Sequence, residues 1–161
     1  MNRILFICHG NICRSPMAEF VLRDLVEQRG LSRQFYIASA ATSTEEIGNP
    51  VHHGTRAILA QHGISTAGKT AVQLQKSDYN AYDYLIGMDS ANIANIRRMT
   101  GHTDSKICRL LDFTDAPRDI ADPWYTGDFD QTYADVLAGC QALLTQLFST
   151  NDGQNLYNNT Y

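Results

Sequence analysis

RILFICHGNICRSP, residues 3–16, joins an unbroken apolar run to a turn that contains Gly and Asn, and then to a proline. The run at 3–7 is rich in residues that favour β-structure, as in a strand buried on both faces of a parallel sheet. Pro16 stands where a helix would begin, a position that favours proline. Apolar residues then recur at helical spacing from Ala18 to Leu25. The stretch therefore predicts a strand, a loop and a helix in that order.

The remaining sequence continues the alternation of strands and helices. Strands are expected at 34–39, 82–88 and 106–111, and helices at 57–62, at 90–99 and at the end, where apolar positions run from Tyr133 to Leu147. In the first helix the face opposite the apolar positions carries Glu19, Arg23, Asp24 and Glu27, and Gly30 is expected to end it. Residues 112–130 contain two prolines and a glycine and are expected to form a long loop.

This alternation predicts an α/β fold: a single-domain, doubly wound sheet of about four parallel strands with helices on both faces. The folded domain would span 1–149, with a loose polar tail at 150–161. Ligands of such sheets bind beyond the carboxyl ends of the strands. Cys8 stands at one such end, and the loop that contains Asp122 follows another.

Composition excludes several classes of protein. The 161 residues carry a net charge of −4, which argues against a nucleic-acid partner. No apolar run approaches the roughly 20 residues that span a bilayer, and no signal peptide is evident. Four cysteines are too few for a disulfide scaffold and fit a cytoplasmic location. No metal site is expected, because no second ligand pair with finger-like spacing is present, and no cofactor is expected.

The segment from Cys8 to Ser15 has the features of a phosphate loop. A turn between a strand and a helix directs consecutive backbone N–H groups into one concavity, and such concavities hold oxyanions. The start of the helix adds its positive end. Gly10 and Asn11 are residue types that tolerate a left-handed backbone, which a tight cradle requires.

Three side chains of this loop fit phosphoryl transfer. Cysteines at helix N-termini can have a pKa of roughly 3.5–7.5, so Cys8 would be an ionised nucleophile. Arg14 can grip two phosphate oxygens with its planar fork. Ser15 can donate a hydrogen bond to the Cys8 sulfur, which would ease departure of the thiolate. The alternative is a buried structural Cys8, a surface Arg14 and a fortuitous pairing of Cys8 with Cys13.

The segment Cys8-His9-Gly10-Asn11-Ile12-Cys13-Arg14-Ser15-Pro16 closely resembles the signature of the low-molecular-weight protein tyrosine phosphatases. The resemblance continues through residues 39–43, 47–50, 61–64, 87–89 and 122–125 and covers the chain to about Phe148. It implies that the whole loop binds phosphate, braced by hydrogen bonds from Asn11, Ser15 and Ser39. It also implies that Asp89 anchors Arg14, although a capping role for Asp89 at the helix from Ser90 is equally natural.

The resemblance implies that Asp122 is the general acid. Departure of a phenolate, with a pKa of about 10, is helped by a proton donor. The alternative is an ordinary turn aspartate before Pro123, and Asp119 is the nearest competing carboxylate.

Aromatic residues beside Asp122 are expected to shape a substrate cleft. Trp124 and Tyr125 would form one wall and His9 another, and the rings would stack on a phosphotyrosine. Core packing of Trp124 is the alternative, and Tyr125 is itself a candidate for phosphorylation. The acidic residues Glu45 and Glu46 are expected to help select peptides.

One departure from the family concerns the support of the loop. Many relatives carry a histidine in the segment written here as residues 66–69, and Gly68 is assigned to that place. With glycine there, a brace onto the phosphate loop is either missing or replaced by another residue, and the rigidity of the loop depends on which of the two holds.

These features predict an enzyme that hydrolyses protein phosphotyrosine through a cysteinyl-phosphate, with phosphotyrosine proteins as partners. The chain is expected to be a monomer or a weak dimer. Peroxide is expected to inactivate it through a Cys8–Cys13 disulfide.

Three other functions use a similar loop. A phosphoarginine phosphatase shares the scaffold, but such relatives tend to have threonine where Ile12 stands, and a bulky Ile12 suits an aromatic ring. An arsenate reductase needs downstream cysteines as a relay, and Cys108 and Cys140 do not form the expected nearby pair. A non-enzymatic phosphate-binding module would not need Cys8, Arg14 and Asp122 together.

Overall fold

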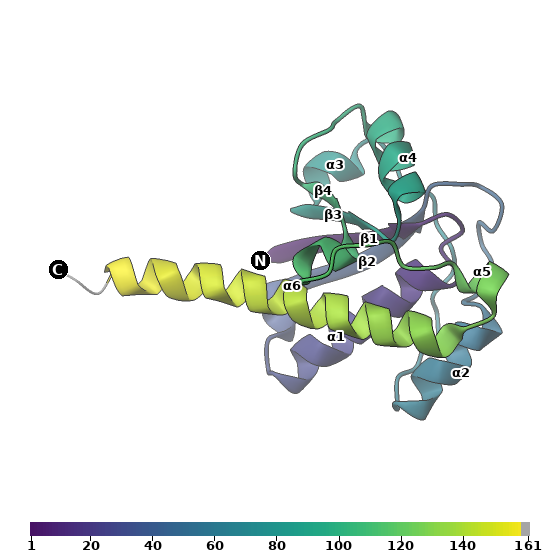
Figure 1. Ribbon diagram of the computed structural model, residues 1–161, viewed down its shortest axis with the longest axis horizontal. Helices are drawn as coiled ribbons and strands as arrows, with labels where there is room; N and C mark the ends of the chain where they lie inside the picture. The colour runs from purple at the N-terminus through teal and green to yellow at the C-terminus, as the bar shows by residue number, and fades with distance from the viewer. Residues whose placement is uncertain (159–161) are drawn as a thin grey trace.

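A parallel four-stranded sheet forms the centre of the molecule (Figure 1). The computed structural model describes the backbone of residues 1–158 and the side chains of residues 1–149. The strands are β1 (Asn2–Cys8), β2 (Phe35–Ala41), β3 (Tyr84–Gly87) and β4 (Ile107–Arg109), in the order β2-β1-β3-β4. All three pairings are parallel, which confirms the predicted sheet.

Helices cover both faces of this sheet. The α-helices are α1 (Arg14–Gln28), α2 (His53–Gln61), α3 (Asp78–Ala81), α4 (Ser90–Thr100), α5 (Pro123–Thr126) and α6 (Phe129–Asn158), and short 3₁₀ helices are η1 (Ser32–Gln34) and η2 (Leu110–Phe113). Figure 1 shows α1, α2 and α6 on one side of the sheet and α3 and α4 on the other. The doubly wound arrangement is therefore confirmed.

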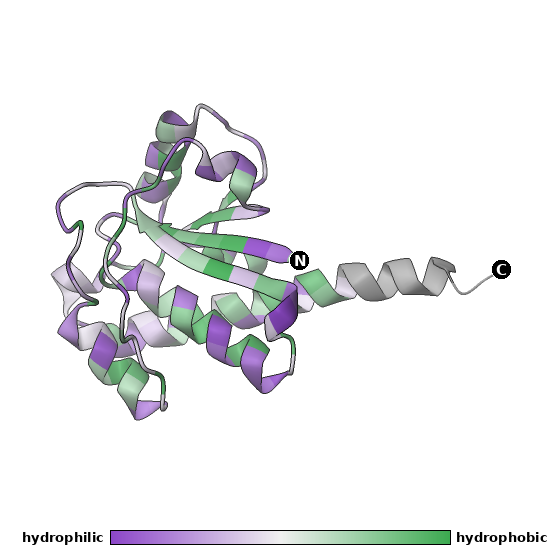
Figure 2. Ribbon diagram, turned by 180° about the vertical axis from the view of Figure 1, so that it is seen from behind, coloured by the Kyte–Doolittle hydropathy of each residue, from purple (hydrophilic) through white to green (hydrophobic). Residues whose placement is uncertain are grey.

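The central strand β1 is buried on both faces. Ile4 and Phe6 belong to the larger core, under α1 and α6, whereas Leu5 and Ile7 belong to the core under α4. Figure 2 shows the apolar residues concentrated in the strands and on the inner faces of the helices. A strand that is apolar at four successive positions contacts two cores at once, which is why residues 4–7 show no alternation.

Several predicted boundaries were wrong by a few residues. Helix α1 begins at Arg14, two residues before Pro16, and β2 runs past Ser39 to Ala41. Helix α2 begins at His53, because the His52 side chain accepts a hydrogen bond from Gly54 N and caps the helix.

The expected long loop at 112–130 also contains regular structure. The segment holds the end of η2, all of α5 and the first residues of α6. Asp122 caps α5, and Pro123 occupies its first position, where the missing N–H costs nothing.

Helix α6 continues through the backbone of 150–158, within the expected loose tail at 150–161. The side chains of this tail, and from 159 its backbone, lie outside the described residues, so its looseness remains a prediction. No helix in the described part of the chain is both long enough and apolar enough to cross a bilayer.

Candidate active site

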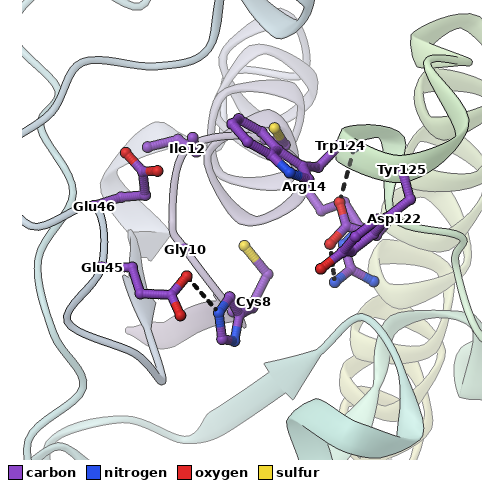
Figure 3. A pocket seen from close by; sticks show the side chains of 11 residues that line it. Cys8, Gly10, Ile12, Arg14, Glu45, Glu46, Asp122, Trp124 and Tyr125 are labelled. Carbon is purple, nitrogen blue, oxygen red and sulfur yellow. Dashed lines mark hydrogen bonds and ion pairs between the residues drawn. The ribbon is translucent and has the colours of Figure 1, made fainter.

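A pocket opens at the carboxyl end of β1 (Figure 3). Its walls come from the phosphate loop, from an acidic loop before α2 and from α5. The lining residues are Cys8, His9, Gly10, Ile12, Cys13, Arg14, Glu45, Glu46, Asp122, Trp124 and Tyr125. The sheet topology therefore brings together residues from two loops that lie more than one hundred positions apart in the chain.

The carbonyl groups of the phosphate loop are held on its outer side. Thr42 N and Ser43 N donate to the Cys8 and His9 carbonyls, at 3.0 Å each. The Ile12 carbonyl accepts from His52 N at 2.8 Å. The Cys13 carbonyl accepts from Thr55 Oγ1 at 3.1 Å. Because outward carbonyls leave the N–H groups free to face inward, these bonds favour an anion-binding concavity.

Asn11 supplies the tight turn of this loop. Its φ of 57° lies in the left-handed region, and no other described non-glycine residue has a positive φ. Gly10 does not have a positive φ. A Cβ at Gly10 would lie in van der Waals contact with the acidic loop, 3.4 Å from Cγ of Glu46.

The Asn11 side chain orients a buried chain of hydrogen bonds. Its Oδ1 accepts from Val72 N, so its amide nitrogen is free to donate to Ser15 Oγ at 2.8 Å and to Ser39 Oγ at 2.9 Å. Ser39 in turn donates to the Glu19 carboxylate at 2.6 Å. Since a carboxylate can only accept, the Ser39 hydroxyl must donate to Glu19, and it therefore accepts from the Asn11 amide.

The Cys8 sulfur lies at the other end of this series of hydrogen bonds. Its sulfur lies 3.0 Å from Ser15 Oγ and accepts from Asn11 N at 3.3 Å. Ser15 already accepts from Asn11, so its own hydrogen is available to the sulfur. Both donors stabilise negative charge on a side chain that is almost completely buried.

Arg14 is buried beside Cys8 and fixed by two acceptors. One guanidinium nitrogen donates to Asp89 Oδ2 at 2.7 Å and to the Ile120 carbonyl at 2.8 Å. Burial alone would lower the pKa of Arg14, but the Cys8 sulfur and Asp89 outweigh it, and the pKa is raised. Asp89 also caps α4 through Asn92 N at 2.7 Å, so the two expected roles coexist in its two oxygens.

The carboxylates Asp122 and Asp119 have different surroundings. Asp122 lines the pocket, with Oδ1 on Trp124 N and Oδ2 at 3.5 Å from Arg14. Asp119 is absent from the pocket lining, and it binds Arg109 and Ser90. Although burial raises the pKa of Asp119, these partners lower it overall, which makes it a poor proton donor. Of the two carboxylates, Asp122 is therefore better placed than Asp119 to give a proton to a group bound in the pocket.

The rim of the pocket is aromatic on one side and acidic on the other. Trp124 is 57% exposed and Tyr125 85% exposed, so neither packs in the core. Figure 3 shows Glu45 and Glu46 on the side of the pocket opposite Trp124 and Tyr125. On the acidic side, His9 Nε2 lies 3.0 Å from Glu45 Oε2. The side chains that were expected to form the cleft walls, Trp124, Tyr125 and His9, thus line the pocket that contains Cys8.

Two functional residues were missed at the sequence level. Glu19, expected on the polar face of α1, is 2% exposed, and Lys69 contacts it at 3.6 Å while donating to the Ser39 carbonyl at 2.9 Å. Lys69, next to Gly68, supplies the brace that Gly68 cannot. The available signal was spacing: Glu19 lies one helical turn after Ser15 and therefore shares its face.

The other two cysteines lie outside the pocket. Cys140 lies on α6 and is buried in the hydrophobic core, which raises its pKa. Cys108 lies in β4, where burial raises its pKa to about 12. Among the residues with described side chains, no group of three His, Cys, Asp or Glu is arranged to hold a metal ion.

A parallel α/β sheet with an anion-binding loop at the end of its first strand defines a phosphate-handling enzyme of the α/β class. Comparison with known proteins narrows this class. The family model described as low molecular weight phosphotyrosine protein phosphatase matches residues 3–153.

Individual relatives agree with the family model. Low molecular weight protein-tyrosine-phosphatase YfkJ from Bacillus subtilis is 43% identical over 150 residues, covering 91% of this chain and 96% of that protein. Its crystal structure superposes with a TM-score of 0.89 at 42% identity, covering 93% of this chain and 96% of that one.

Two further solved structures are similar. Streptococcus pyogenes SP-PTP, a low molecular weight protein tyrosine phosphatase, has a TM-score of 0.82 at 44% identity, covering 91% and 93% of the two chains. DARP, a drosophila arginine phosphatase, has a TM-score of 0.82 at 28% identity, covering 90% and 98%. The chain belongs to the low molecular weight phosphotyrosine protein phosphatase family. By class it is a phosphoric monoester hydrolase.

Proposed function

We propose that this enzyme hydrolyses phosphotyrosine in proteins through a cysteinyl-phosphate on Cys8, with Arg14 as phosphate clamp and Asp122 as general acid and base. The observation that carries the proposal is that all three side chains line one pocket, with Ser15 Oγ 3.0 Å from the Cys8 sulfur. A non-enzymatic phosphate-binding protein would need neither the buried thiol nor a carboxyl group facing it.

In the first step, the Cys8 thiolate attacks phosphorus and the bond from phosphorus to the tyrosine oxygen breaks. Protonated Asp122 gives its proton to the departing phenolate, which leaves as neutral tyrosine. The loop N–H groups and Arg14 stabilise the charge on the three transferring oxygens.

In the second step, a water molecule replaces the thiolate. Asp122, now ionised, takes a proton from this water as its oxygen attacks the phosphocysteine. The sulfur–phosphorus bond breaks, inorganic phosphate forms, and the Ser15 hydroxyl stabilises the returning thiolate.

Substrate choice is proposed to depend on the rings and on Ile12. Trp124 and Tyr125 stand beside Asp122, where the leaving group must lie, and aromatic pairs favour a tyrosine ring there. Ile12 adds a bulky apolar side chain to the lining. Phosphoarginine is the alternative substrate, since DARP, which is 28% identical, is a drosophila arginine phosphatase.

The discriminating experiment compares one peptide sequence carrying phosphotyrosine, phosphoarginine or phosphoserine. We expect kcat/KM to be highest for phosphotyrosine, and Cys8→Ser to hydrolyse none of them while still binding vanadate. Rapid acid quench followed by mass spectrometry should show a phosphate on the peptide that contains Cys8. Turnover by Cys8→Ser would refute the covalent mechanism, and equal rates on phosphotyrosine and phosphoarginine would refute the assigned specificity.

We further propose phosphotyrosine proteins as the partners and the cytoplasm as the compartment. The four free cysteines support a reducing environment. Fractionation of the source cells would test this.

A further inference from the structure

His52 lies at the junction between the phosphate loop and the start of α2. Its backbone N–H donates to the Ile12 carbonyl at 2.8 Å. Its Nδ1 accepts from Gly54 N at 3.0 Å and so caps α2. An acceptor at Nδ1 assigns the hydrogen of the neutral ring to Nε2. One residue thus ties the loop that binds phosphate to a helix that carries no catalytic group.

The ring of His52 reaches the other wall of the site. It stacks on Phe129, with centroids 5.1 Å apart, and meets the Trp124 ring edge to face, at 5.7 Å and 77°. Trp124 follows Asp122 by two residues, and Trp124 N donates to the Asp122 carboxylate. The His52 ring therefore supports, from behind, the segment that holds the general acid.

The neighbouring glycine makes this junction tight. A Cβ at Gly54 would lie 2.5 Å from the Phe129 ring, so only glycine lets the start of α6 press against the start of α2. Phe129 also packs on the cluster that contains Ile12 and Cys13. Figure 1 shows α2 and α5 beside the beginning of α6.

We propose that His52 is a positioning residue that sets the aromatic wall of the cleft: its neutral ring holds Trp124 in place relative to the phosphate loop. The proposal rests on the proposed function, in which Trp124 contacts the ring of the substrate. Because the ring and the backbone N–H of His52 act on different parts of the site, their effects are separable by mutation.

The charges around His52 favour its neutral form. Burial lowers its pKa, and the positive charges of His53 and Arg56 on α2 lower it further, whereas Glu46 from the acidic loop acts in the opposite direction. From α5 and α6 the contacting rings, Trp124 and Phe129, carry no charge. Protonation would also place a hydrogen on the nitrogen that accepts from Gly54, so the imidazolium form would lose the cap and disturb the wall.

The chain supplies its own probe for this contact, because Trp124 is its single tryptophan. An imidazolium against an indole quenches its emission, whereas neutral imidazole quenches it far less. Emission from the wild-type protein should fall as the pH decreases, with a midpoint below the ordinary histidine pKa of about 6.5. The measurement requires no turnover.

Three variants separate the functions of the residue. His52→Asn keeps a cap acceptor and the backbone N–H but removes the ring. His52→Phe keeps a ring but removes the cap. His53→Asn removes the neighbouring ring, which stacks on His52, and serves as the matched control.

For His52→Asn we expect the KM for para-nitrophenyl phosphate to rise roughly 2- to 10-fold, the range of one aromatic pair. The inhibition constant of inorganic phosphate should not change, since the backbone bond to Ile12 remains. The pH titration of Trp124 emission should disappear. His52→Phe should recover the KM without recovering the titration. His53→Asn should keep the KM and still titrate, with its midpoint moved to higher pH because the positive charge of His53 no longer lowers the pKa of His52.

Two results would overturn the proposal. If His52→Asn keeps the wild-type KM and emission profile, the ring does not position Trp124. If KM and the inhibition constant of phosphate rise together and His52→Phe does not recover either, the residue only stabilises the fold. Should the wild-type protein fail to hydrolyse aryl phosphates, the proposed function is wrong, while the emission titration still tests the contact of His52 with Trp124.

Discussion

Arg14 and Asp89, 75 positions apart in the chain, are joined by a hydrogen bond of 2.7 Å at the base of the pocket. Asp89 is also the cap of α4, so one carboxylate serves both the clamp and the fold. The two roles can be separated, because asparagine is as good a cap as aspartate but carries no charge.

Asp89→Asn is therefore expected to lower kcat/KM by about tenfold or more, in line with the roughly 1.5–3 kcal/mol of a hydrogen bond to a charged group. Its thermal midpoint should change little, whereas Asp89→Ala should lose activity and also about 1 kcal/mol of stability from the missing cap. Steady-state kinetics and thermal unfolding measure the two effects. Equal loss of stability in both variants would contradict the division of roles.

Asp122→Ala should slow hydrolysis of aryl phosphates by about 10²–10⁴, the usual contribution of a general acid. The loss should grow as the pKa of the leaving phenol rises, because poor leaving groups depend most on protonation. Rates across a series of substituted phenyl phosphates provide the measurement. Asp119→Ala is the control, and a steep dependence in that variant would mean that Asp119 is the proton donor.

The brace behind the phosphate loop offers a matched pair of variants. Lys69 and Arg23 both contact the Glu19 carboxylate, but their side chains are 12% and 48% exposed. Lys69→Met should cost about 1–3 kcal/mol of unfolding free energy, as for a buried group that loses its partner. Arg23→Met should cost about 0–1 kcal/mol, as for an exposed ion pair. Urea unfolding compares them, and a larger cost for Arg23→Met would contradict the assignment of Lys69 as the brace.

Cys13 is expected to protect Cys8 from irreversible oxidation. Burial, together with negative charge on Cys8, raises the pKa of Cys13 to about 12, so it is a neutral thiol near pH 7. Peroxide would convert the Cys8 thiolate to a sulfenic acid, and the Cys13 thiol would displace water from it to form a disulfide. Wild type should then regain activity with a thiol reductant, whereas Cys13→Ser should not. Full recovery of the mutant would exclude Cys13 as the protecting thiol.

Ile12→Thr should increase the hydrolysis of phosphoarginine peptides relative to phosphotyrosine peptides. The isoleucine side chain narrows the pocket with apolar atoms, whereas a smaller hydroxyl-bearing side chain leaves room for a guanidinium. The ratio of the two kcat/KM values is the observable. An unchanged ratio would show that Ile12 does not control the choice.

The part of the site that could be predicted is the part that is local in sequence. Residues 8–15 carry the turn, the thiol and the guanidinium within one segment, and β1 and α1 fix its ends. The order of elements was also predictable, because apolar periodicity is a local property.

The supports of the loop could not be predicted, because they come from distant segments. Val72 holds Asn11 from 61 positions away, and Lys69 holds Ser39 from 30. Glu19 resembled an ordinary polar position of an amphipathic helix. Its spacing from Ser15 placed it on the same helix face, but its burial depends on tertiary packing. Helix α5 was missed because four residues are too few for a periodic signal.

The outward carbonyls of the phosphate loop have a consequence for how the enzyme acquires activity. Their donors lie just after β2 and at the start of α2, including its cap, so the loop cannot keep its shape until segments of high sequence separation have docked. Closing such long loops costs chain entropy, and the contacts within the eight residues of the phosphate loop are too few to offset this cost alone. A peptide of residues 8–15 would therefore not bind phosphate, and during refolding catalytic activity would return only with the last cooperative step.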